Sequence, residues 1–379
     1  MGELVDRVVR KNTNNESTLP LTISAQYGLV DQITYFNNRV ASRDVSNYYL
    51  VLNGEFAYNK STSDGYPFGA VKRLDLYEKG VLSTLYIVFS PKKEQQVDSD
   101  FLTVFFDTDR WHKGVAERAA EGARNHGLLN ISAEDFFDID LSVPKDVAEQ
   151  KQIGAFIRQL DNLITLHQRK FEKLTNVKKS MLEKMFPQNG CSYPEIRFKG
   201  FTDAWEQRKV SELAEKTYGG GTPSTLNEAY WDGDIPWIQS SDVVDGRLFG
   251  VVPRKRITQY GLNNSATQLV PKNSIAIITR VGVGKLAFMP YSYATSQDFL
   301  SLSKLNAEPL FTVYACYKKL QSELNAVQGT SIKGITKDEL LAKTVMVPQY
   351  AEQQQIGAFF SQLDNLITLH QRKHLRLHP

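Results

Sequence analysis

The sequence has little cysteine and no long apolar stretch. Its two cysteines, Cys191 and Cys316, cannot form a disulfide framework or a four-ligand zinc site by themselves. No run of about eighteen apolar residues occurs, and the opening residues, MGELVDRVVRKN, lack the apolar core of a signal peptide. These absences argue against a disulfide-stapled secreted domain and against a membrane-spanning protein. We therefore expect a cytoplasmic protein without membrane association.

The chain also lacks a large excess of charge of either sign. Its 45 Lys and Arg residues nearly balance 42 Asp and Glu residues, which leaves a net charge of +3. A generally basic coat for nucleic acid is therefore excluded, and any basic surface has to be local. An apolar fraction of 41% and a charged fraction of 23% are typical of globular proteins. A length of 379 residues predicts two or three domains of roughly 100–200 residues each.

Recognisable catalytic motifs are missing as well. The segment RVGVGKL at 280–286 has neither the spacing of a phosphate-binding loop nor the Ser or Thr that would follow its lysine. No G-x-S-x-G, H-E-x-x-H or Asn-Pro-Pro-aromatic motif occurs. His370, His374 and His378 share a helical face, but no carboxylate supports them as metal ligands. We therefore predict that the chain has no catalytic and no metal-binding residues.

The most informative feature is an internal repeat. Residues 148–170 read AEQKQIGAFIRQLDNLITLHQRK and residues 351–373 read AEQQQIGAFFSQLDNLITLHQRK, so twenty of twenty-three positions are identical. Weaker similarity continues in order outside this segment: VSELAEK at 210–216 resembles MGELVDR at 1–7, and a Val-Pro pair precedes each copy. The chain is therefore two copies of a variable domain followed by a nearly fixed segment. This arrangement is not a solenoid, whose repeats run to roughly 20–50 residues.

The fixed segment has the pattern of a long helix. In the first copy Pro144 stands at a helix-entry position, and Asp146 with Glu149 has the spacing of a capping box. Apolar residues then recur at heptad spacing along one face, and the pattern stops at Pro187. A helix of about 41 residues, at about 1.5 Å per residue, is a rod of roughly 60 Å.

The apolar seam of such a rod requires a partner, and the second copy repeats the seam. We predict that the two helices pair as an antiparallel coiled coil within the chain. The residues predicted to pair are Ile153, Ile157, Leu160, Ile164, Ile356, Phe360, Leu363 and Ile367. A histidine interrupts the seam in each copy, at His167 and His370. The alternative is that each helix packs only on its own domain, but a seam that recurs on two divergent units favours a role shared by both.

The predicted fold class is α+β, with two mixed α/β domains of short strands and much loop. The β-rich runs lie at 48–51, 55–58, 82–89, 101–106, 274–279 and 299–305. Residues 188–203 contain the Pro, Gly and polar residues of a connector. The predicted organisation is a first domain at 1–143, a helix at 144–187, a linker at 188–203, a second domain at 204–346 and a helix at 347–379, related by a pseudo-two-fold internal repeat.

Polar loops punctuated by glycine recur at matching places in the two domains. The loop at 59–69 follows the strand GEFAY, and the loop at 280–285 follows the strand SIAIIT. The run YGGGTPS at 218–224 and a further loop pair at 122–126 and 329–333 have a similar composition. Each loop taken singly fits a solvated turn, but their recurrence favours a shared function.

The composition of these loops suits the binding of a polyanion. Glycine lets a backbone approach phosphate closely, Lys and Arg neutralise phosphate, and Asn, Gln, Ser and Arg can read base edges. The candidate DNA-binding residues are Lys60, Ser61, Ser63, Tyr66, Lys72, Arg73, Arg124, Thr222, Ser240, Arg280, Lys285 and Lys333.

The order of these elements resembles the specificity (S) subunit of type I restriction-modification systems. The resemblance rests on the doubled AEQ-x-Q-IG-AF helix after a Val-Pro pair. It also rests on the run at 219–242, from GGGTPS through IPWI to Asp242, which is similar to the start of a target recognition domain of that family. It covers essentially the whole chain.

The resemblance implies a non-catalytic subunit for DNA recognition. Each variable domain would be a target recognition domain that reads one half of a bipartite, asymmetric site in double-stranded DNA. The paired helices would set the half-site spacing and dock two modification (methyltransferase) subunits, through which restriction (motor-nuclease) subunits attach indirectly. The chain itself would hold no cofactor, because S-adenosylmethionine, ATP and Mg²⁺ would belong to the partner subunits.

The sequence departs from that family's pattern at both ends. The second unit has the lead-in WEQRK at 205–209 before VSELAEK, whereas the first unit begins at the equivalent of VSELAEK. The second helix is also predicted to be shorter than the first. These departures concern the far end of the predicted coiled coil and one of the two surfaces expected to dock a methyltransferase subunit.

Two functions of other classes remain open at this point. A stand-alone DNA-modifying or DNA-cleaving enzyme would need a cofactor pocket and an active site of unrecognised type. A coiled-coil interaction protein without DNA contact would lack the salt-dependent affinity for duplex DNA that phosphate neutralisation produces.

Overall fold

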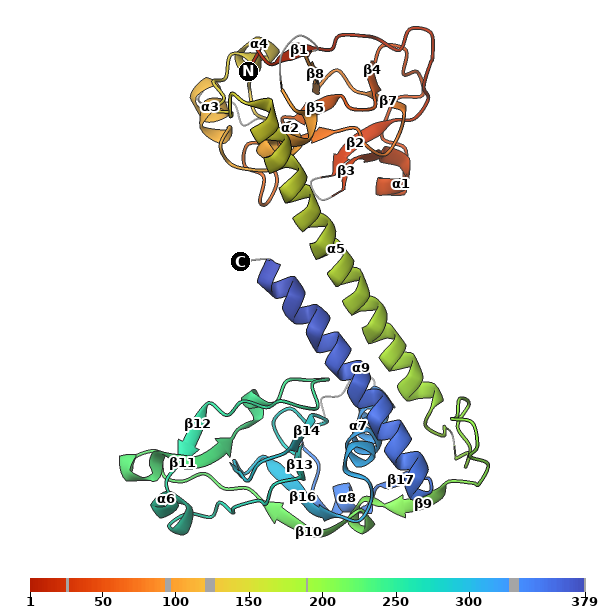
Figure 1. Cartoon of the computed structure of the whole chain (residues 1–379), viewed down its shortest axis with the longest axis vertical. Coiled ribbons are helices and arrows are strands. Elements are labelled where there is room, and N and C mark those ends of the chain that lie inside the picture. The colour runs from red at the N-terminus through yellow and green to blue at the C-terminus, as the bar shows by residue number, and fades with distance from the viewer. Residues whose placement is uncertain (25–26, 93–96, 120–126, 189, 327–333, 378–379) are drawn as a thin grey trace. The chain divides into compact units, whose positions relative to one another are not determined.

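The computed structural model describes residues 1–24, 27–92, 97–119, 127–188, 190–326 and 334–377. The chain divides into two units, Met1–Thr165 and Leu166–Pro379, and Figure 1 labels the elements of each. Within the described ranges no helix has the length and the apolar character needed to cross a bilayer.

The first unit consists of short antiparallel strands, small helices and the start of a long helix. Its strands are β1 (Val5–Arg7), β2 (Leu21–Ser24), β3 (Gly28–Asp31), β4 (Tyr49–Leu52), β5 (Phe56–Asn59), β6 (Ala70–Arg73), β7 (Lys79–Leu82) and β8 (Ile87–Pro91). Its helices are α1 (Gln32–Phe36), α2 (Ser99–Phe106), α3 (His112–Arg118), α4 (Ala133–Phe137) and the first part of α5 (Val147–Lys184). The main sheet has the order β1-β8-β5-β6, beside the pairs β2-β3 and β4-β7.

The second unit holds the rest of α5, a larger domain and the second long helix. Its strands are β9 (Glu206–Lys209), β10 (Ala214–Gly219), β11 (Trp231–Ile238), β12 (Lys255–Ile257), β13 (Ser274–Ile278), β14 (Leu286–Met289), β15 (Ala294–Thr295), β16 (Phe299–Leu305) and β17 (Thr344–Val347). Its helices are α6 (Gln259–Asn263), α7 (Pro309–Ala326), α8 (Lys337–Ala342) and α9 (Tyr350–Leu377), with short 3-10 helices η1 (Val210–Glu212), η2 (Glu228–Tyr230) and η3 (Ser240–Asp242). The sheets have the orders β10-β16-β13-β14, β12-β11-β15 and β17-β9.

The two units share the strand order of their main sheets. β1 and β10 lie at one edge, β8 and β16 come next, β5 and β13 follow, and β6 and β14 lie at the other edge. All of these neighbours are antiparallel. The repeat in the sequence therefore extends to the topology of the main sheets.

Aromatic side chains fill the core of the first unit. The rings of Phe56 and Phe89, on adjacent strands, stack with centroids 5.3 Å apart, and Tyr58 stacks on Phe136 of α4 at 4.4 Å. Trp111 is 2% exposed and donates from Nε1 to a backbone carbonyl. Large rings of this kind supply much of the apolar area buried in a small domain, so the loops at the strand ends start from a rigid framework.

Each long helix is fixed to its own domain by a glutamine of the repeated motif. The Gln150 side chain accepts a hydrogen bond from the backbone N–H of Asp98 at 2.8 Å and donates to the carbonyl of the proline before α5 at 2.7 Å. Gln353 makes the same two bonds, with the N–H of Glu308 at 2.9 Å and the carbonyl of the proline before α9 at 2.7 Å. Both glutamines are buried. The long helices α5 and α9 are thereby tied to the first turns of α2 and α7.

A glycine four residues after each glutamine lets these helices come close. A Cβ atom added to Gly154 would lie 2.8 Å from the backbone nitrogen of Phe101, and one added to Gly357 would lie 2.9 Å from that of Phe311. Because protein interiors are closely packed, they cannot accommodate such an overlap, and a larger residue would displace the long helix from its domain. The Gln-x-x-x-Gly spacing thus serves the same contact in both copies.

One predicted strand, at 101–106, is helix α2 in the structure. The Asp98 side chain accepts a hydrogen bond from the backbone N–H of Phe101 at 2.8 Å and so caps the helix. The side chains buried on one face are Phe101, Leu102, Phe105 and Phe106. An apolar run of this length fits either a strand or a helix. The helix is favoured because the buried apolar residues form pairs four residues apart and an aspartate caps the first turn.

The predicted strand at 82–89 is interrupted. β7 ends at Leu82 and β8 begins at Ile87, with a turn between them in which the N–H of Tyr86 donates to the carbonyl of Ser83 at 3.1 Å. The other predicted strands agree to within one residue with β4, β5, β13 and β16.

The two long helices lie within the ranges predicted for them, with 38 residues in α5 and 28 in α9. The boundary between the units falls inside α5, after Thr165, and not at either predicted end of the helix. The reason is that Ile153 packs in the core of the first unit, whereas Leu174 and Met181 pack in the core of the second.

Replacing Gln353 by methionine tests the anchor of α9. The substitution keeps a similar volume but leaves the Glu308 N–H and the Pro348 carbonyl without this buried partner, which costs about 1–3 kcal/mol of unfolding free energy. We expect the unfolding of the second unit to shift to a lower urea concentration. Gln354→Met, an exposed position on the same turn, is the matched control and should change stability by less than about 0.5 kcal/mol. Equal losses of unfolding free energy in Gln353→Met and Gln354→Met would contradict the role of Gln353 as an anchor of α9.

Candidate nucleic-acid interface

The glycine-punctuated loops leave the two main sheets at corresponding places. Residues 60–69 follow β5 and residues 279–285 follow β13, and these two strands hold the same position in the shared strand order. Each strand is flanked by the equivalent neighbours, β8 and β6 in one unit and β16 and β14 in the other. The correspondence predicted from the sequence therefore agrees with the topology.

In the second unit this loop borders a cleft of about 740 Å³. Residues that line it include Gly219, Gly220, Thr279, Arg280, Gln297 and Lys337. Arg280 and Lys337 are exposed, and neither forms an ion pair with a described residue. Cations in this state can neutralise phosphate, while the amide and hydroxyl groups beside them can reach base edges.

The glycine run beside this cleft is mostly packed. A Cβ atom on Gly220 would lie 1.7 Å from the carbonyl oxygen of Ser296, and one on Gly221 would lie 2.5 Å from the backbone nitrogen of Thr267. Of the three glycines, Gly219 alone has no described atom within 4 Å of such a Cβ. We therefore expect only Gly219 to bring its backbone close to a phosphate. Gly220 and Gly221 instead leave room for the backbone segments that pass beside them.

The equivalent loop of the first unit is held against residues 127–131. The N–H of Thr62 donates to the carbonyl of Gly127 at 2.7 Å, and the amine of Lys60 donates to the carbonyl of Ile131 at 3.2 Å. The exposed candidates in this loop are Ser61, Ser63 and Tyr66. The loop thus offers hydroxyl groups at its rim, while the Lys60 amine is partly satisfied within the protein.

Two cations predicted to contact DNA are engaged inside the first unit. The Arg73 side chain is 9% exposed and forms ion pairs with Asp75 at 2.7 Å and Asp100 at 2.8 Å. Lys72 is 15% exposed and pairs with Asp107 at 2.6 Å. A phosphate would have to compete with these carboxylates of the same unit, and the contact of both residues with DNA stays a prediction.

The remaining candidate DNA-binding residues differ in how far they are exposed. Thr222 is exposed, while Ser240, the first residue of η3, and Lys285 are partly buried. Arg124 and Lys333 lie outside the described residues.

The structure adds two residues that the sequence did not single out. Gln297 and Lys337 line the same cleft as Arg280, although they come from the turn before β16 and from the first turn of α8. The backbone N–H of Glu339 donates to the Thr336 hydroxyl at 3.2 Å in a capping box that fixes the start of α8. That box could be found in the sequence, but its place beside Arg280 depends on the fold.

Within the second unit the later part of α5 lies alongside α9 (Figure 1). The Nδ1 atoms of His167 and His370 are 3.0 Å apart. Further along α5, the Lys178 amine pairs with Asp364 at 2.5 Å. Residue numbers thus rise along α5 as they fall along α9, so the two helices run in opposite directions over this stretch. The two histidines occupy equivalent positions of the repeat.

Asp364 fixes the register of this contact. It accepts hydrogen bonds from the Lys178 amine and, at 2.7 Å, from the Tyr314 hydroxyl of α7. Burial and the adjacent carboxylate raise the pKa of Tyr314, which keeps its hydroxyl protonated as a donor. A carboxylate between two donors is a directional contact, unlike the apolar packing around it.

The residues predicted to pair the helices fall in two places. Those buried in the core of the second unit are Ile356, Phe360 and Leu363, and Ile367 on the same helix is partly buried. From α5 the residues that pack there are Leu174, Met181 and Leu182. Ile153 packs against the core of the first unit, as its counterpart Ile356 packs in that of the second, and the equivalent anchors Gln150 and Gln353 hold both turns. The role of Ile153 in pairing the helices stays a prediction. Ile157, Leu160 and Ile164 are partly exposed in the first unit.

Clusters that could carry other chemistry are few in the described part of the chain. There, no group of three or more His, Cys, Asp or Glu residues could hold a metal ion. Cys191 is a free, exposed thiol and Cys316 a free, buried one. The expectation that the chain has no catalytic and no metal-binding residues remains a prediction.

Comparison with known proteins finds a family and named relatives. Residues 77–176 and 202–378 match the type I restriction modification DNA specificity domain. The chain is 30% identical over 170 residues to the type I restriction enzyme MjaIX specificity subunit of Methanocaldococcus jannaschii, which covers 43% of this chain and 38% of the relative. It is 31% identical over 169 residues to the EcoR124I/EcoR124II specificity subunit of Escherichia coli, which covers 42% of this chain and 41% of the relative. These matches thus span well under two thirds of either relative.

A solved structure supports the fold. The S subunit of a type I restriction-modification system from M. genitalium aligns with a TM-score of 0.56 and 12% identity, covering 99% of this chain and 91% of that chain. At this identity the likeness concerns the fold alone.

The histidine contact predicts a dependence of helix pairing on pH. Partial burial, then the neighbouring charges of His167, Lys170 and Lys373, lower the pKa of His370 from its usual 6.5. The paired helices therefore favour neutral His370. The contribution of this contact to the unfolding free energy should be fully present above about pH 6.5 and should decline as the pH falls below that value. An NMR titration should give an imidazole pKa below 6.5, and His370→Gln should flatten the fall in the urea midpoint between about pH 7.5 and 5.5. A value at or above 6.5 would contradict this contact.

Proposed function

Because the chain belongs to the type I restriction modification DNA specificity domain family, we propose that it is the DNA-recognition subunit of a type I restriction-modification complex. Each domain reads one half of a bipartite, asymmetric site in double-stranded DNA. The observation that carries this proposal is the pair of polar loops at equivalent ends of two sheets with the same strand order. Equivalent positions with different side chains suit two readers of different sequences.

The two long helices serve as the spacer between the readers. Support comes from the opposite directions of α5 and α9 around His167 and His370, and from the near-identity of residues 148–170 with 351–373. A residue that meets its own counterpart is what an antiparallel coiled coil with a pseudo-two-fold axis requires. A rigid spacer raises the effective concentration of the second reader once the first is bound, and it makes one gap between half-sites productive.

The outer faces of the helices dock two copies of a modification (methyltransferase) subunit, and restriction subunits attach through them. Support comes from exposed leucines at equivalent positions of the repeat, with exposed fractions of 45% for Leu163, 44% for Leu366, 45% for Leu166 and 46% for Leu369. Apolar side chains left in solvent at equivalent positions suit two identical partners.

Chemistry belongs to the partners in this proposal. The chain itself is non-catalytic, and the partner subunits hold S-adenosylmethionine, ATP and Mg²⁺. The complex works in the cytoplasm, where the DNA is accessible and where free thiols such as Cys191 and Cys316 remain reduced.

Substituting Arg280 tests the second reader. Arg280→Ala should weaken binding to duplex DNA carrying the full site and reduce the slope of log affinity against log salt by about one, because one phosphate contact is lost. Lys272→Ala is the matched control, since this exposed lysine precedes β13 at the end of the strand opposite Arg280. Equal effects of the two substitutions would contradict the assignment.

The asymmetry of the site gives a second test. In duplexes that alter one half-site at a time, Arg280→Ala should lower discrimination at one half only, and Lys60→Ala should do so at the other half. Loss of discrimination at both halves from a single substitution would refute the division of labour between the domains.

Methylation in cells tests the whole proposal. Cells that express this chain with its modification subunit should carry a methylated motif with two specific parts separated by a gap of fixed length, read by methylome sequencing. An uninterrupted motif, or methylation unaffected by removal of this chain, would reject it.

A further inference from the structure

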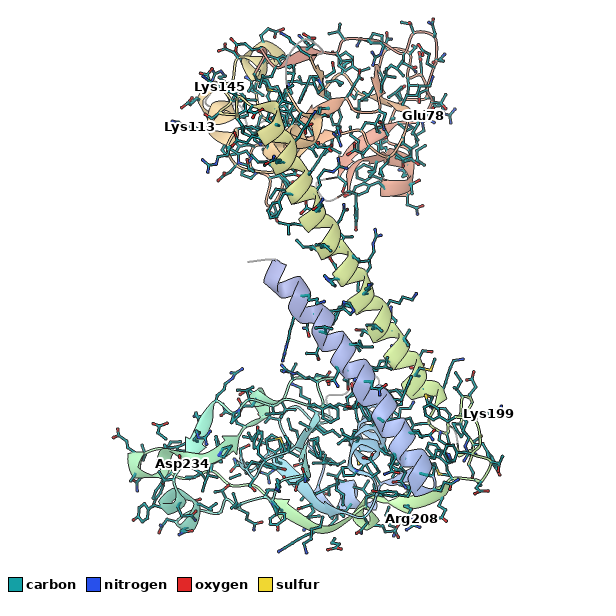
Figure 2. The ribbon with its side chains drawn as sticks, in the orientation of Figure 1. Glu78, Lys113, Lys145, Lys199, Arg208 and Asp234 are labelled. Carbon is teal, nitrogen blue, oxygen red and sulfur yellow. The ribbon has the colours of Figure 1, made fainter. Side chains whose placement is uncertain are left out.

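In the second unit a short segment before the domain covers the start of α9. Residues 197–209 run from the end of the linker through β9. Figure 2 labels Lys199 and Arg208 of this segment on the side of the unit where α9 begins. We call residues 197–209 the docking segment. It makes three kinds of contact with the end of the domain and with α9.

The first contact is an ion pair. Arg197 donates from Nε and Nη2 to the two carboxylate oxygens of Glu352, both at 2.8 Å. The side chain of Glu352 is 0% exposed. A carboxylate so deeply buried requires a paired cation, and the two-pronged geometry of this pair is the strongest that arginine offers.

The second and third contacts are an aromatic pair and a strand pair. The ring of Phe198 lies 6.0 Å from that of Phe359 on α9, in an edge-on arrangement. Strand β9 pairs antiparallel with β17, the strand just before α9. Val345 and Val347 of β17 are buried.

The first unit carries the same glutamate and phenylalanine, and a short segment before its long helix that forms no strand. Glu149 and Phe156 stand where Glu352 and Phe359 stand in the second copy, and residues 140–143 precede the first Val-Pro helix as β17 precedes the second. Glu149 is exposed and makes no ion pair with a described residue. Phe156 is 60% exposed. Residues 140–143 form no ladder with any strand of the described chain.

We propose that this face of the first unit is a docking site for a segment of another polypeptide chain with the chemistry of the docking segment. Its counterpart of Arg197 would pair with Glu149, its counterpart of Phe198 would pack on Phe156, and its backbone would pair with residues 140–143 as β9 pairs with β17. The face offers the Glu149 carboxylate, the exposed ring of Phe156 and a backbone segment that pairs with no described strand, so it complements a cation followed by an aromatic ring and an extended backbone. Strand addition with side-chain pockets is a recurring mode of peptide recognition.

The comparison between the units identifies the occupant. The acceptor glutamate and phenylalanine are the same residue types in both copies, and in the second copy the docking segment contacts both. Exposed in water, Glu149 is hydrated and costs the first unit nothing, so the site is stable when empty. Occupied, it would bury the aromatic ring and the carboxylate together, as at Phe359 and Glu352.

A labelled peptide of residues 195–210, EIRFKGFTDAWEQRKV, is the probe. Added to the full chain, it should bind with one-to-one stoichiometry by fluorescence anisotropy. Glu149→Gln and Phe156→Ser should each weaken binding by about tenfold or more, which is about 1.4 kcal/mol or more. Both positions are exposed, so the variants should keep the circular dichroism and the thermal unfolding of the parent.

Glu78→Gln is the matched control, because Figure 2 places Glu78 on the opposite side of the first unit from Lys145, which lies just before α5. It should leave peptide binding unchanged, whereas a peptide in which the arginine corresponding to Arg197 is replaced by methionine should lose binding to the parent chain. Binding that is insensitive to both Glu149→Gln and Phe156→Ser would place the peptide elsewhere, for example by displacement of the chain's own segment from Glu352, and would overturn the proposal. Absence of binding at millimolar peptide would overturn it equally.

Discussion

The buried amide of one glutamine holds each long helix to the domain before it, and the other features of the chain depend on that contact. Gln150 and Gln353 each bind the backbone N–H of the residue just before another helix, α2 or α7, and the carbonyl of a proline. The glycine that follows removes the side chain that would keep the helices apart. A helix anchored in this way cannot turn freely against its domain, so the loops of that domain keep a constant direction relative to the helix.

Polar contacts also set where α5 and α9 meet in the second unit. Apolar packing in a helix seam tolerates a slip of one turn, since leucine, isoleucine and phenylalanine exchange at modest cost. Asp364 does not tolerate it, because Lys178 and the Tyr314 hydroxyl both donate to its carboxylate. The paired histidines add a second fixed point, whose strength depends on the neutral form of His370. In the spacer that we propose, polar contacts that fix the register of the helices matter more than additional apolar packing between them, because the register sets the distance between the DNA readers.

The two copies of the repeat use identical residues in different surroundings. Glu352 is buried under Arg197, whereas Glu149 faces solvent. The same residue type is thus part of the interior in one copy and an available acceptor in the other. Loops of the two domains diverge in a similar way: Arg280 is exposed beside a cleft, while Lys60 of the first unit donates to a carbonyl of its own domain.

Sequence alone determined the repeat, the two long helices, four of the six strands foreseen and membership in a family of DNA-specificity subunits. These features follow from local sequence, that is, from the near-identity of residues 148–170 with 351–373 and from the spacing of apolar residues. Contacts between distant segments account for the rest: residues 101–106 are a helix, Arg73 and Lys72 are ion-paired within the first unit, Ile153 packs against a domain core, and Gln297 and Lys337 lie beside Arg280. Whether a charge or an apolar face is available depends on which distant residues fold against it, and a local sequence pattern does not record those neighbours.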